Sequence, residues 1–284
     1  MSVAGGLYKG IQRAVAVGCQ CVQIFTKNNN QWNAKPLTDA DVDAWRGELE
    51  KSGLVSPIAH ASYLINLATP DEELWAKSID ALTIELQRAD QLGLSGLVLH
   101  PGAFTTSDEI AGLRRVVAAA GQLFARYTPH TCRLLLENTA GQGSCLGHSF
   151  AQLGYLWDAI AAPAQLGFCF DTCHAFAAGY DLRTAVGFAA MRKELTDAVP
   201  IDSIKALHLN DSLKDCGSRV DRHQHIGQGK LGQEAFVQVF ADPIFCKLPG
   251  YLETPKGTDP GTGEDYDSRN LTILRKLAAK ARAS

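Results

Sequence analysis

Short apolar runs alternate along the chain with longer segments in which apolar residues recur every three or four positions. The short runs have the length of buried parallel strands, and the longer segments have the period of amphipathic helices. Seven strands are predicted, ending near residues 25, 60, 100, 137, 171, 208 and 253. Helices are predicted at residues 4–17, 38–51, 70–92, 107–127, 149–160, 181–199, 232–240 and 265–281. Such alternation favours parallel strands joined by right-handed crossovers.

This alternation predicts an α/β fold, either closed into an eight-stranded barrel or left open as a doubly wound sheet. A closed barrel of this kind needs eight strands, but the chain begins directly with a helix and supplies seven. We therefore expect a barrel that lacks its first strand. No linker or change of composition divides the sequence, so residues 1–284 are expected to form a single domain.

The composition is that of an ordinary soluble protein, with 46% hydrophobic and 20% charged residues. No apolar run approaches the ~18 residues of a membrane span, and the N-terminus lacks a basic region followed by an apolar core. We therefore expect a cytoplasmic protein that does not contact membranes. The formal net charge of −3 does not by itself favour nucleic-acid binding, although bound cations would change that balance.

Six of the predicted strands end on a residue that can bind a metal ion. These residues are His60, His100, Glu137, Asp171, His208 and Glu253. In a barrel all six strand ends meet at one face, and the following loops add His174, Asp221 and His223. Any one of them alone would be interpreted as a helix cap or a hydrogen-bonded core residue. Six in register indicate a shared site, because buried carboxylates and imidazoles are unfavourable without a compensating partner.

The nine side chains, five imidazoles and four carboxylates, outnumber the roughly four to six ligands of one divalent ion, which indicates two or three ions. A mixture of imidazole and carboxylate suits zinc or manganese better than calcium or magnesium. A cluster of several metal ions is a common device for in-line displacement at phosphorus. We therefore expect a metal-dependent enzyme that acts on a phosphate ester.

Two glycine-rich segments, Gly141–Gly147 and Gly227–Gly232, loosely resemble nucleotide- or phosphate-binding loops. Both are interpreted as plain loops that approach another group closely, since neither has the full pattern of such a motif. Three further histidines have no evident partner and are interpreted as surface residues: His130, His148 and His225.

Longer motifs surround the candidate ligands: His60–Leu67, His100–Gly102, Glu137–Gly143, Asp171–Asp181, His208–Asp211, Gly217–His223 and Leu252–Pro255. Together they resemble the endonuclease IV family, and the match extends over nearly the whole chain. The resemblance implies a (β/α)8 TIM barrel that holds three zinc ions. It also implies an enzyme that hydrolyses DNA on the 5′ side of abasic (AP) sites, leaving a 3′-hydroxyl and a 5′-deoxyribose phosphate.

The same resemblance implies a role for each candidate ligand. The first metal would be held by His60, His100 and Glu137. Glu137 would bridge to the second metal, which is completed by Asp171, His208 and Glu253. The third metal would be held by His174, Asp221 and His223. Zinc is the expected metal, with manganese an alternative at one site, and Glu137 would help to deprotonate the attacking water.

Enzymes of this kind flip the damaged nucleotide out of the duplex and fill the gap with side chains. By resemblance, Tyr63 and Leu64 match that pattern, whereas Asn30 stands where some members carry Arg. Lys27 and Arg222 are among several cations in or near loops that would face phosphates. Three zinc ions would add six positive charges and change the formal net charge from −3 to +3. The expected partner is double-stranded DNA containing abasic sites, and the protein is expected to be a monomer.

Two alternatives remain. A sugar isomerase or epimerase of the xylose-isomerase type also places acids and a histidine at barrel strand ends, here Glu137, Asp171, His208 and Glu253. The other five candidate ligands favour the nuclease, because a one-metal isomerase has no use for them. A barrel that binds abasic DNA without cutting it is the second alternative.

Overall fold

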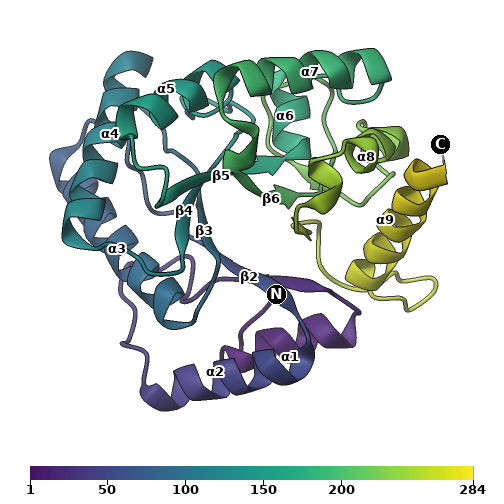
Figure 1. Cartoon of the computed structure of the whole chain (residues 1–284), viewed down its shortest axis with the longest axis horizontal. Coiled ribbons are helices and arrows are strands. Elements are labelled where there is room, and N and C mark those ends of the chain that lie inside the picture. Colours follow the sequence, from purple (N-terminus) through teal and green to yellow (C-terminus); the bar gives the residue numbers. More distant parts are fainter. Residues whose placement is uncertain (284) are drawn as a thin grey trace. The chain divides into compact units, whose positions relative to one another are not determined.

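The computed structural model describes residues 1–283, and contacts along the chain divide it into two compact units. The first unit comprises Met1–Glu137, Ser144–Leu146 and Gly154–Phe168. The second unit comprises Asn138–Gly143, Gly147–Leu153 and the chain from Cys169 onward. Strands and helices alternate within each unit, as predicted (Figure 1).

Four parallel strands form the sheet of the first unit, in the order β1-β2-β3-β4. They are β1 (Cys21–Ile24), β2 (Val55–His60), β3 (Gly96–Leu99) and β4 (Arg133–Glu137). The helices of this unit are α1 (Tyr8–Ala16), α2 (Asp39–Ser52), α3 (Glu72–Gln91) and α4 (Glu109–Arg126). α1 packs against α2, and α3 packs against α4 (Figure 1). Two elements begin in one unit and end in the other: α5 (Phe150–Ile160) and β5 (Leu166–Asp171).

Strand register in the first unit aligns the candidate ligands. Leu99 lies opposite Leu136 in the β3–β4 pair, so the next residues along, His100 and Glu137, are level with each other. His60 at the end of β2 lies opposite Val98, two residues before His100. Every residue of β3 is buried, as are the last four of β4, which is typical of parallel strands covered on both faces. The three ligands therefore leave the sheet at the same edge.

Helix starts follow local capping chemistry. At α2 the Thr38 side chain accepts a hydrogen bond from the Asp41 backbone N–H, and the Asp41 carboxylate accepts one from the Thr38 N–H. The helix predicted to start at residue 107 begins at Glu109, because the Asp108 carboxylate caps it by accepting from the Ala111 N–H.

The second unit contains the end of β5, followed in the sheet by β6 (Ile204–His208) and β9 (Gly250–Tyr251). β6 and β9 are parallel, with His208 opposite Tyr251. The helices of this unit are α6 (Thr172–Ala178), α7 (Ala185–Ala198), α8 (Gly232–Ala241) and α9 (Tyr266–Ala283), with short 3-10 helices at Ile201–Ser203 and Phe245–Lys247. α8 and α9 pack against each other (Figure 1).

Two segments of the second unit differ from the sequence-based expectation. The loop expected after Asp171 is the helix α6, which begins there because the Asp171 side chain caps it. The segment between the strand that ends at residue 208 and the helix predicted at 232–240, where no element was predicted, contains an antiparallel ribbon of β7 (Asp211–Ser212) and β8 (His223–Gln224). Strands of two residues are too short to leave a periodic pattern in the sequence.

The seven predicted strands are all present, and within residues 1–283 no strand precedes α1. β9 ends at Tyr251, so Glu253 lies two residues beyond its strand rather than at the strand end. Among the helices of residues 1–283, none combines the length and apolar character that crossing a membrane requires.

Candidate metal centre

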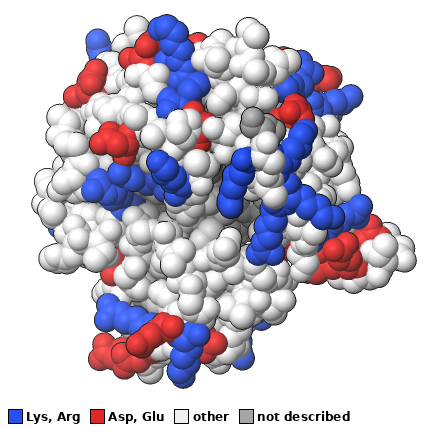
Figure 2. All heavy atoms as spheres, turned by 45° about the vertical axis from the view of Figure 1, so that its right-hand side comes forward, with Lys and Arg blue, Asp and Glu red and all other residues white. Residues whose placement is uncertain are grey.

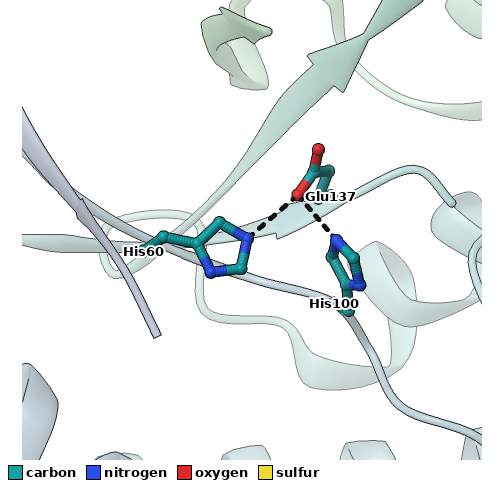
Figure 3. A group of neighbouring side chains, drawn as sticks. All are labelled: His60, His100 and Glu137. Atoms are coloured by element: carbon teal, nitrogen blue, oxygen red, sulfur yellow. Dashed lines mark ion pairs between the residues drawn. The ribbon is translucent and has the colours of Figure 1, made fainter. Parts of the chain in front are cut away.

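Three candidate ligands converge in the first unit (Figure 3). Nε2 of His60 and Nε2 of His100 point to the same carboxylate oxygen, Oε2 of Glu137, at 3.4 Å and 3.1 Å. His60 and Glu137 are buried, whereas the His100 side chain keeps 30% of its surface exposed. This group is therefore accessible to solvent through His100.

A backbone hydrogen bond fixes the tautomer of His60. Its Nδ1 lies 2.7 Å from the carbonyl oxygen of Ala61, which can only accept, so the ring hydrogen is on Nδ1. Nε2 of the neutral ring then directs its lone pair at the Glu137 carboxylate. Two acceptors that face each other are unfavourable unless a proton or a metal ion lies between them. A histidine held through its other nitrogen is the usual arrangement around a ligated metal.

The same device recurs in the second unit at His174 and His223. Nδ1 of His174 donates to the Asn138 carbonyl at 2.9 Å, and Nδ1 of His223 donates to the Glu253 carbonyl at 3.2 Å. The two Nε2 atoms then face each other at 3.3 Å. Carboxylate oxygens of Asp221 lie 3.2 Å from Nε2 of His174 and 3.5 Å from Nε2 of His223. Three side chains thus direct their ligand atoms toward one another.

A neighbouring group in the second unit joins Asp171, His208 and Glu253. Nδ1 of His208 lies 3.2 Å from Oε2 of Glu253 and 3.8 Å from Oδ2 of Asp171. Asp171 and His208 are fully buried, and Glu253 exposes 16% of its side chain. Oδ2 of Asp171 also lies 3.8 Å from Nε2 of His223, so this carboxylate takes part in both groups of the unit.

Asn210 orients two of these ligands and was missed by the sequence analysis. Its Nδ2 donates to Oδ2 of Asp171 at 2.6 Å, while its Oδ1 accepts from the Glu253 backbone N–H at 2.8 Å. Oδ1 of Asp171 is held separately by the His174 backbone N–H at 2.7 Å. The available signal was the polar pair Asn210-Asp211 directly after a strand, since buried polar groups are rarely left without a hydrogen-bonding role.

The spacing of the ligand atoms fits zinc. Tetrahedral zinc, bound at about 2.0–2.1 Å from nitrogen and oxygen, has neighbouring ligand atoms about 3.3–3.4 Å apart. The distances of 3.1 and 3.4 Å at Glu137, and of 3.2 and 3.5 Å at Asp221, lie close to that value. Imidazole nitrogen with carboxylate oxygen is also a donor set that zinc and manganese accept. Residues of both units can therefore hold metal ions.

The predicted DNA-contacting residues have different environments. Tyr63 is 57% exposed, and its ring centroid lies 5.1 Å from that of His60, so this side chain stands beside the ligands of the first unit. Leu64 is half-buried, whereas Asn30 and Arg222 are exposed. Lys and Arg side chains gather in several groups on the face drawn in Figure 2, between wide areas without charged side chains.

Two residues expected at the surface have buried side chains. Nζ of Lys27 lies 3.1 Å from Oε1 of Glu85, and only 5% of the Lys27 side chain is exposed, so it pairs internally instead of facing phosphates. The interpretation of His225 as a surface residue is also wrong. Its ring stacks on Tyr266, its Nδ1 accepts from Nδ2 of Asn270, and burial lowers its pKa.

The sequence is similar to those of known proteins. Residues 11–277 match the family described as a xylose isomerase-like TIM barrel. A probable endonuclease 4 of Trichlorobacter lovleyi is 45% identical over 277 residues, covering 98% of this chain and 97% of the relative. A probable endonuclease 4 of Chloroflexus aurantiacus is 47% identical over 281 residues, covering 99% and 97%.

Solved structures give the same result. The crystal structure of endonuclease IV from Thermus thermophilus matches with a TM-score of 0.85 at 36% identity, covering 99% of this chain and 97% of that chain. A D-tagatose 3-epimerase-like protein matches with a TM-score of 0.71 at 16% identity, covering 99% and 96%, which shows a shared fold alone.

The fold and the clustered ligands define a TIM barrel of the xylose isomerase-like class, which confirms the predicted barrel. Within this class, the chain is 45–47% identical to two probable endonuclease 4 proteins over nearly their full length. The chain belongs to the endonuclease IV family and is a nuclease enzyme. The match to the D-tagatose 3-epimerase-like protein shows a shared architecture.

Proposed function

We propose that this nuclease hydrolyses the phosphodiester on the 5′ side of abasic sites in double-stranded DNA, with three zinc ions per chain. The chief support is the convergence of imidazoles and carboxylates in groups whose ligand atoms are spaced as zinc requires. The names of the similar proteins, endonuclease 4 and endonuclease IV, agree with this activity. The products are a 3′-hydroxyl and a 5′-deoxyribose phosphate.

Each zinc has its own ligands in this proposal. The first is held by His60, His100 and Glu137. The second would be held by Asp171, His208 and Glu253. The third is held by His174, Asp221 and His223, and manganese can replace zinc at one site. When bound, the ions supply hydroxide at neutral pH and stabilise the charge that develops on the phosphate and the leaving oxygen.

Glu137 acts as the base in this mechanism. Its carboxylate is fully buried, and two imidazoles approach one of its oxygens. From that position Glu137 accepts a proton from the attacking water, which displaces the 3′ oxygen in line. Asn210 holds the Asp171 carboxylate in one orientation through its hydrogen bond to Oδ2. A metal ligand that is already oriented does not have to reorganise during hydrolysis.

Loop side chains of the first unit recognise the lesion in this proposal. Tyr63, exposed beside His60, and Leu64, which follows it, fill the gap left by the flipped abasic nucleotide. Asn30 lies in a second loop. The two loops are joined by a hydrogen bond from the Ser62 hydroxyl to the Asn29 carbonyl oxygen at 2.6 Å. Arg222 is exposed and contacts a backbone phosphate.

We further propose that the enzyme is a cytoplasmic, single-domain monomer that works on chromosomal DNA. Light scattering of the zinc-loaded protein checks the oligomeric state, and a dimer mass would contradict this part of the proposal. A single cooperative unfolding transition checks the single domain, since independent domains would unfold in separate steps.

The decisive experiment uses a duplex with one reduced abasic analogue. Such an analogue cannot undergo β-elimination, so a cut on its 5′ side must come from hydrolysis. We expect cleavage there by the zinc-loaded protein, and no cleavage of an undamaged duplex of the same sequence. Failure to cut after zinc reconstitution would refute the assignment. A metal content near one per chain with epimerase activity would favour the sugar enzyme instead.

A further inference from the structure

The glycine-rich segment Gly227–Gly232, which resembles a phosphate-binding loop, encloses a carboxylate of the protein itself. Oδ2 of Asp211 accepts hydrogen bonds from the backbone N–H groups of Gly227 at 2.8 Å and Gly229 at 3.1 Å. Oδ1 accepts from Leu231 at 3.0 Å and Gly232 at 3.2 Å. The Asp211 side chain therefore occupies the place that a bound anion would take in such a loop.

The surroundings of Asp211 are those of a built internal site. The residue is fully buried, and Oδ1 also accepts from the Ser212 backbone N–H at 2.7 Å. Its partners Leu231 and Gly232 start α8, a helix whose own N-cap residue makes no side-chain hydrogen bond. Asp211 thus caps α8 from twenty positions earlier in the sequence and places a negative charge at its N-terminus, where the helix dipole favours it.

Gly229 shows how closely the Gly227–Gly232 segment packs around the Asp211 carboxylate. A Cβ atom at this position would lie 2.4 Å from Oδ1 of Asp211 and 2.3 Å from the Ser212 carbonyl oxygen. Gly229 does not adopt a positive φ, so the reason for glycine here is the close approach of Asp211.

Asp211 also lies at the base of the loop that carries two candidate ligands. It pairs with Gln224 across the β7–β8 ribbon, and Ser212 pairs with His223. The intervening chain bears Asp221. The Asp211 carboxylate thereby joins β7, the first strand of the ribbon, to the segment that begins three residues after β8, because it binds Gly227 and Gly229. The position of His223 and Asp221 relative to His174 therefore depends on this closure.

We propose that Asp211 is a positioning residue that closes the 211–232 loop and thereby sets the metal affinity of the group formed by His174, Asp221 and His223. This inference rests on the proposed function in one respect, the binding of metal by that group. Asp211 touches neither the metal nor the substrate. It acts through the ribbon that presents the two loop ligands.

The test is Asp211→Asn, compared with Asp242→Asn. Asp242 is also a nearly buried aspartate of the second unit that accepts two backbone N–H bonds, from Ile244 and Phe245, but it lies outside the loop. Both variants lose a buried charge and part of its hydrogen-bonding capacity, so both should unfold at a lower temperature. At a fixed, buffered free-zinc concentration, Asp211→Asn should hold one zinc fewer per chain than the wild type, and Asp242→Asn should hold the wild-type number.

Zinc titration separates positioning from a general folding defect. Asp211→Asn should recover its missing zinc, and its activity with it, when free zinc is raised by about 10–100-fold, the range typical of lost support for a metal ligand. Wild-type zinc content and affinity in Asp211→Asn would overturn the inference. If zinc is lost as expected but the wild type does not cut abasic DNA, the inference stands and the proposed function falls.

A second variant keeps the inference testable should Asp211→Asn fail to fold. Gly229→Ala keeps the Asp211 carboxylate, but the added methyl group would clash with Oδ1 of Asp211. It should also lower zinc affinity, whereas Gly47→Ala, at a helical position with open space for a Cβ, should not. Unchanged zinc affinity in Gly229→Ala would count against Asp211 as the closing residue.

Discussion

Three of the five candidate histidine ligands are held in the same way, by donation from Nδ1 to a backbone carbonyl. The acceptors are the carbonyls of Ala61 for His60, Asn138 for His174 and Glu253 for His223. Each bond fixes both the ring orientation and the tautomer, so the lone pair of Nε2 is available before any metal arrives. Preorganisation of this kind lowers the cost of binding the ion.

Glu137→Gln tests the proposed base at the scale of one residue. The amide keeps the size of the side chain but cannot accept the proton, so kcat should fall by about 10²–10⁴-fold. Circular dichroism and thermal unfolding should show that the variant folds. Glu50→Gln, at an exposed position of α2, is the matched control and should leave kcat unchanged. Wild-type turnover by Glu137→Gln would refute the role.

Tyr63→Ala tests the recognition of the lesion. Loss of an aromatic side chain that fills the duplex gap should weaken binding to abasic DNA by about 1–3 kcal/mol, the range found for base–aromatic contacts. Zinc content should not change, because Tyr63 packs beside the ligands without being one. Fluorescence anisotropy with abasic and undamaged duplexes measures the effect. Tyr155→Ala, another exposed tyrosine, should bind like the wild type.

At the scale of elements, α3 departs from a simple amphipathic helix. Its buried face carries three charged residues, Glu85, Arg88 and Asp90, as well as apolar ones. Glu85 binds Lys27 through an ion pair and accepts from the Ser62 backbone N–H at 3.2 Å. Burial raises the pKa of Glu85 although the charge of Lys27 opposes that shift. One helix thus ties together the two loops that carry Asn30 and Tyr63.

Asp90 fastens the end of α3 to the chain that enters β4. Burial acts to raise the pKa of its carboxyl, but hydrogen bonds from the backbone N–H groups of His130, Thr131 and Cys132 and from the Tyr127 hydroxyl outweigh burial and lower it. A carboxyl whose pKa is lowered by folding contributes stability above its unfolded value. That contribution disappears as the pH falls through the lowered pKa.

Asp90→Asn should therefore lower the free energy of unfolding by about 2–3 kcal/mol at neutral pH, since one amide oxygen cannot replace a carboxylate among these donors. The difference from the wild type should shrink as the pH falls below 3.8, the ordinary value for this carboxyl. Urea unfolding at several pH values measures it. Asp80→Asn, on the exposed side of α3, should cost much less. A pH-independent loss would contradict this account.

At the scale of the whole molecule, metal content should govern both charge and DNA binding. If three zinc ions are bound as proposed, chelation should change the formal net charge of the protein from +3 to the −3 of the bare chain. The stripped protein should bind duplex DNA more weakly, and the slope of log K against log salt should be shallower than for the loaded protein. It should also unfold at a lower temperature, because the ions bind the folded state.

Zinc added back to the stripped protein should restore binding, stability and cleavage, whereas magnesium should not, because imidazole ligands suit zinc. Equal salt slopes with and without zinc would show that the metal ions do not contribute to the attraction of DNA.

The elements and the candidate ligands could be predicted because their signals are local. A buried strand needs a short apolar run, and an amphipathic helix needs a repeat of three to four residues, wherever either one packs. Candidate ligands such as His60 and Glu137 could be picked out because they end such runs. Errors arose where the signal is short. The helix predicted from residue 107 begins only after its cap Asp108, and the two-residue strands of the β7–β8 ribbon have no period.

The sequence by itself thus determined the order of strands and helices, the family and the set of candidate ligands. Only the tertiary structure decided which polar groups meet: Asp211 with the Gly227–Gly232 segment, Asn210 with Asp171, and Lys27 with Glu85. The physical reason is that these partners lie 16 to 58 positions apart in the sequence. Whether a buried charge finds its hydrogen bonds depends on where distant backbone segments come to lie, which no local pattern encodes.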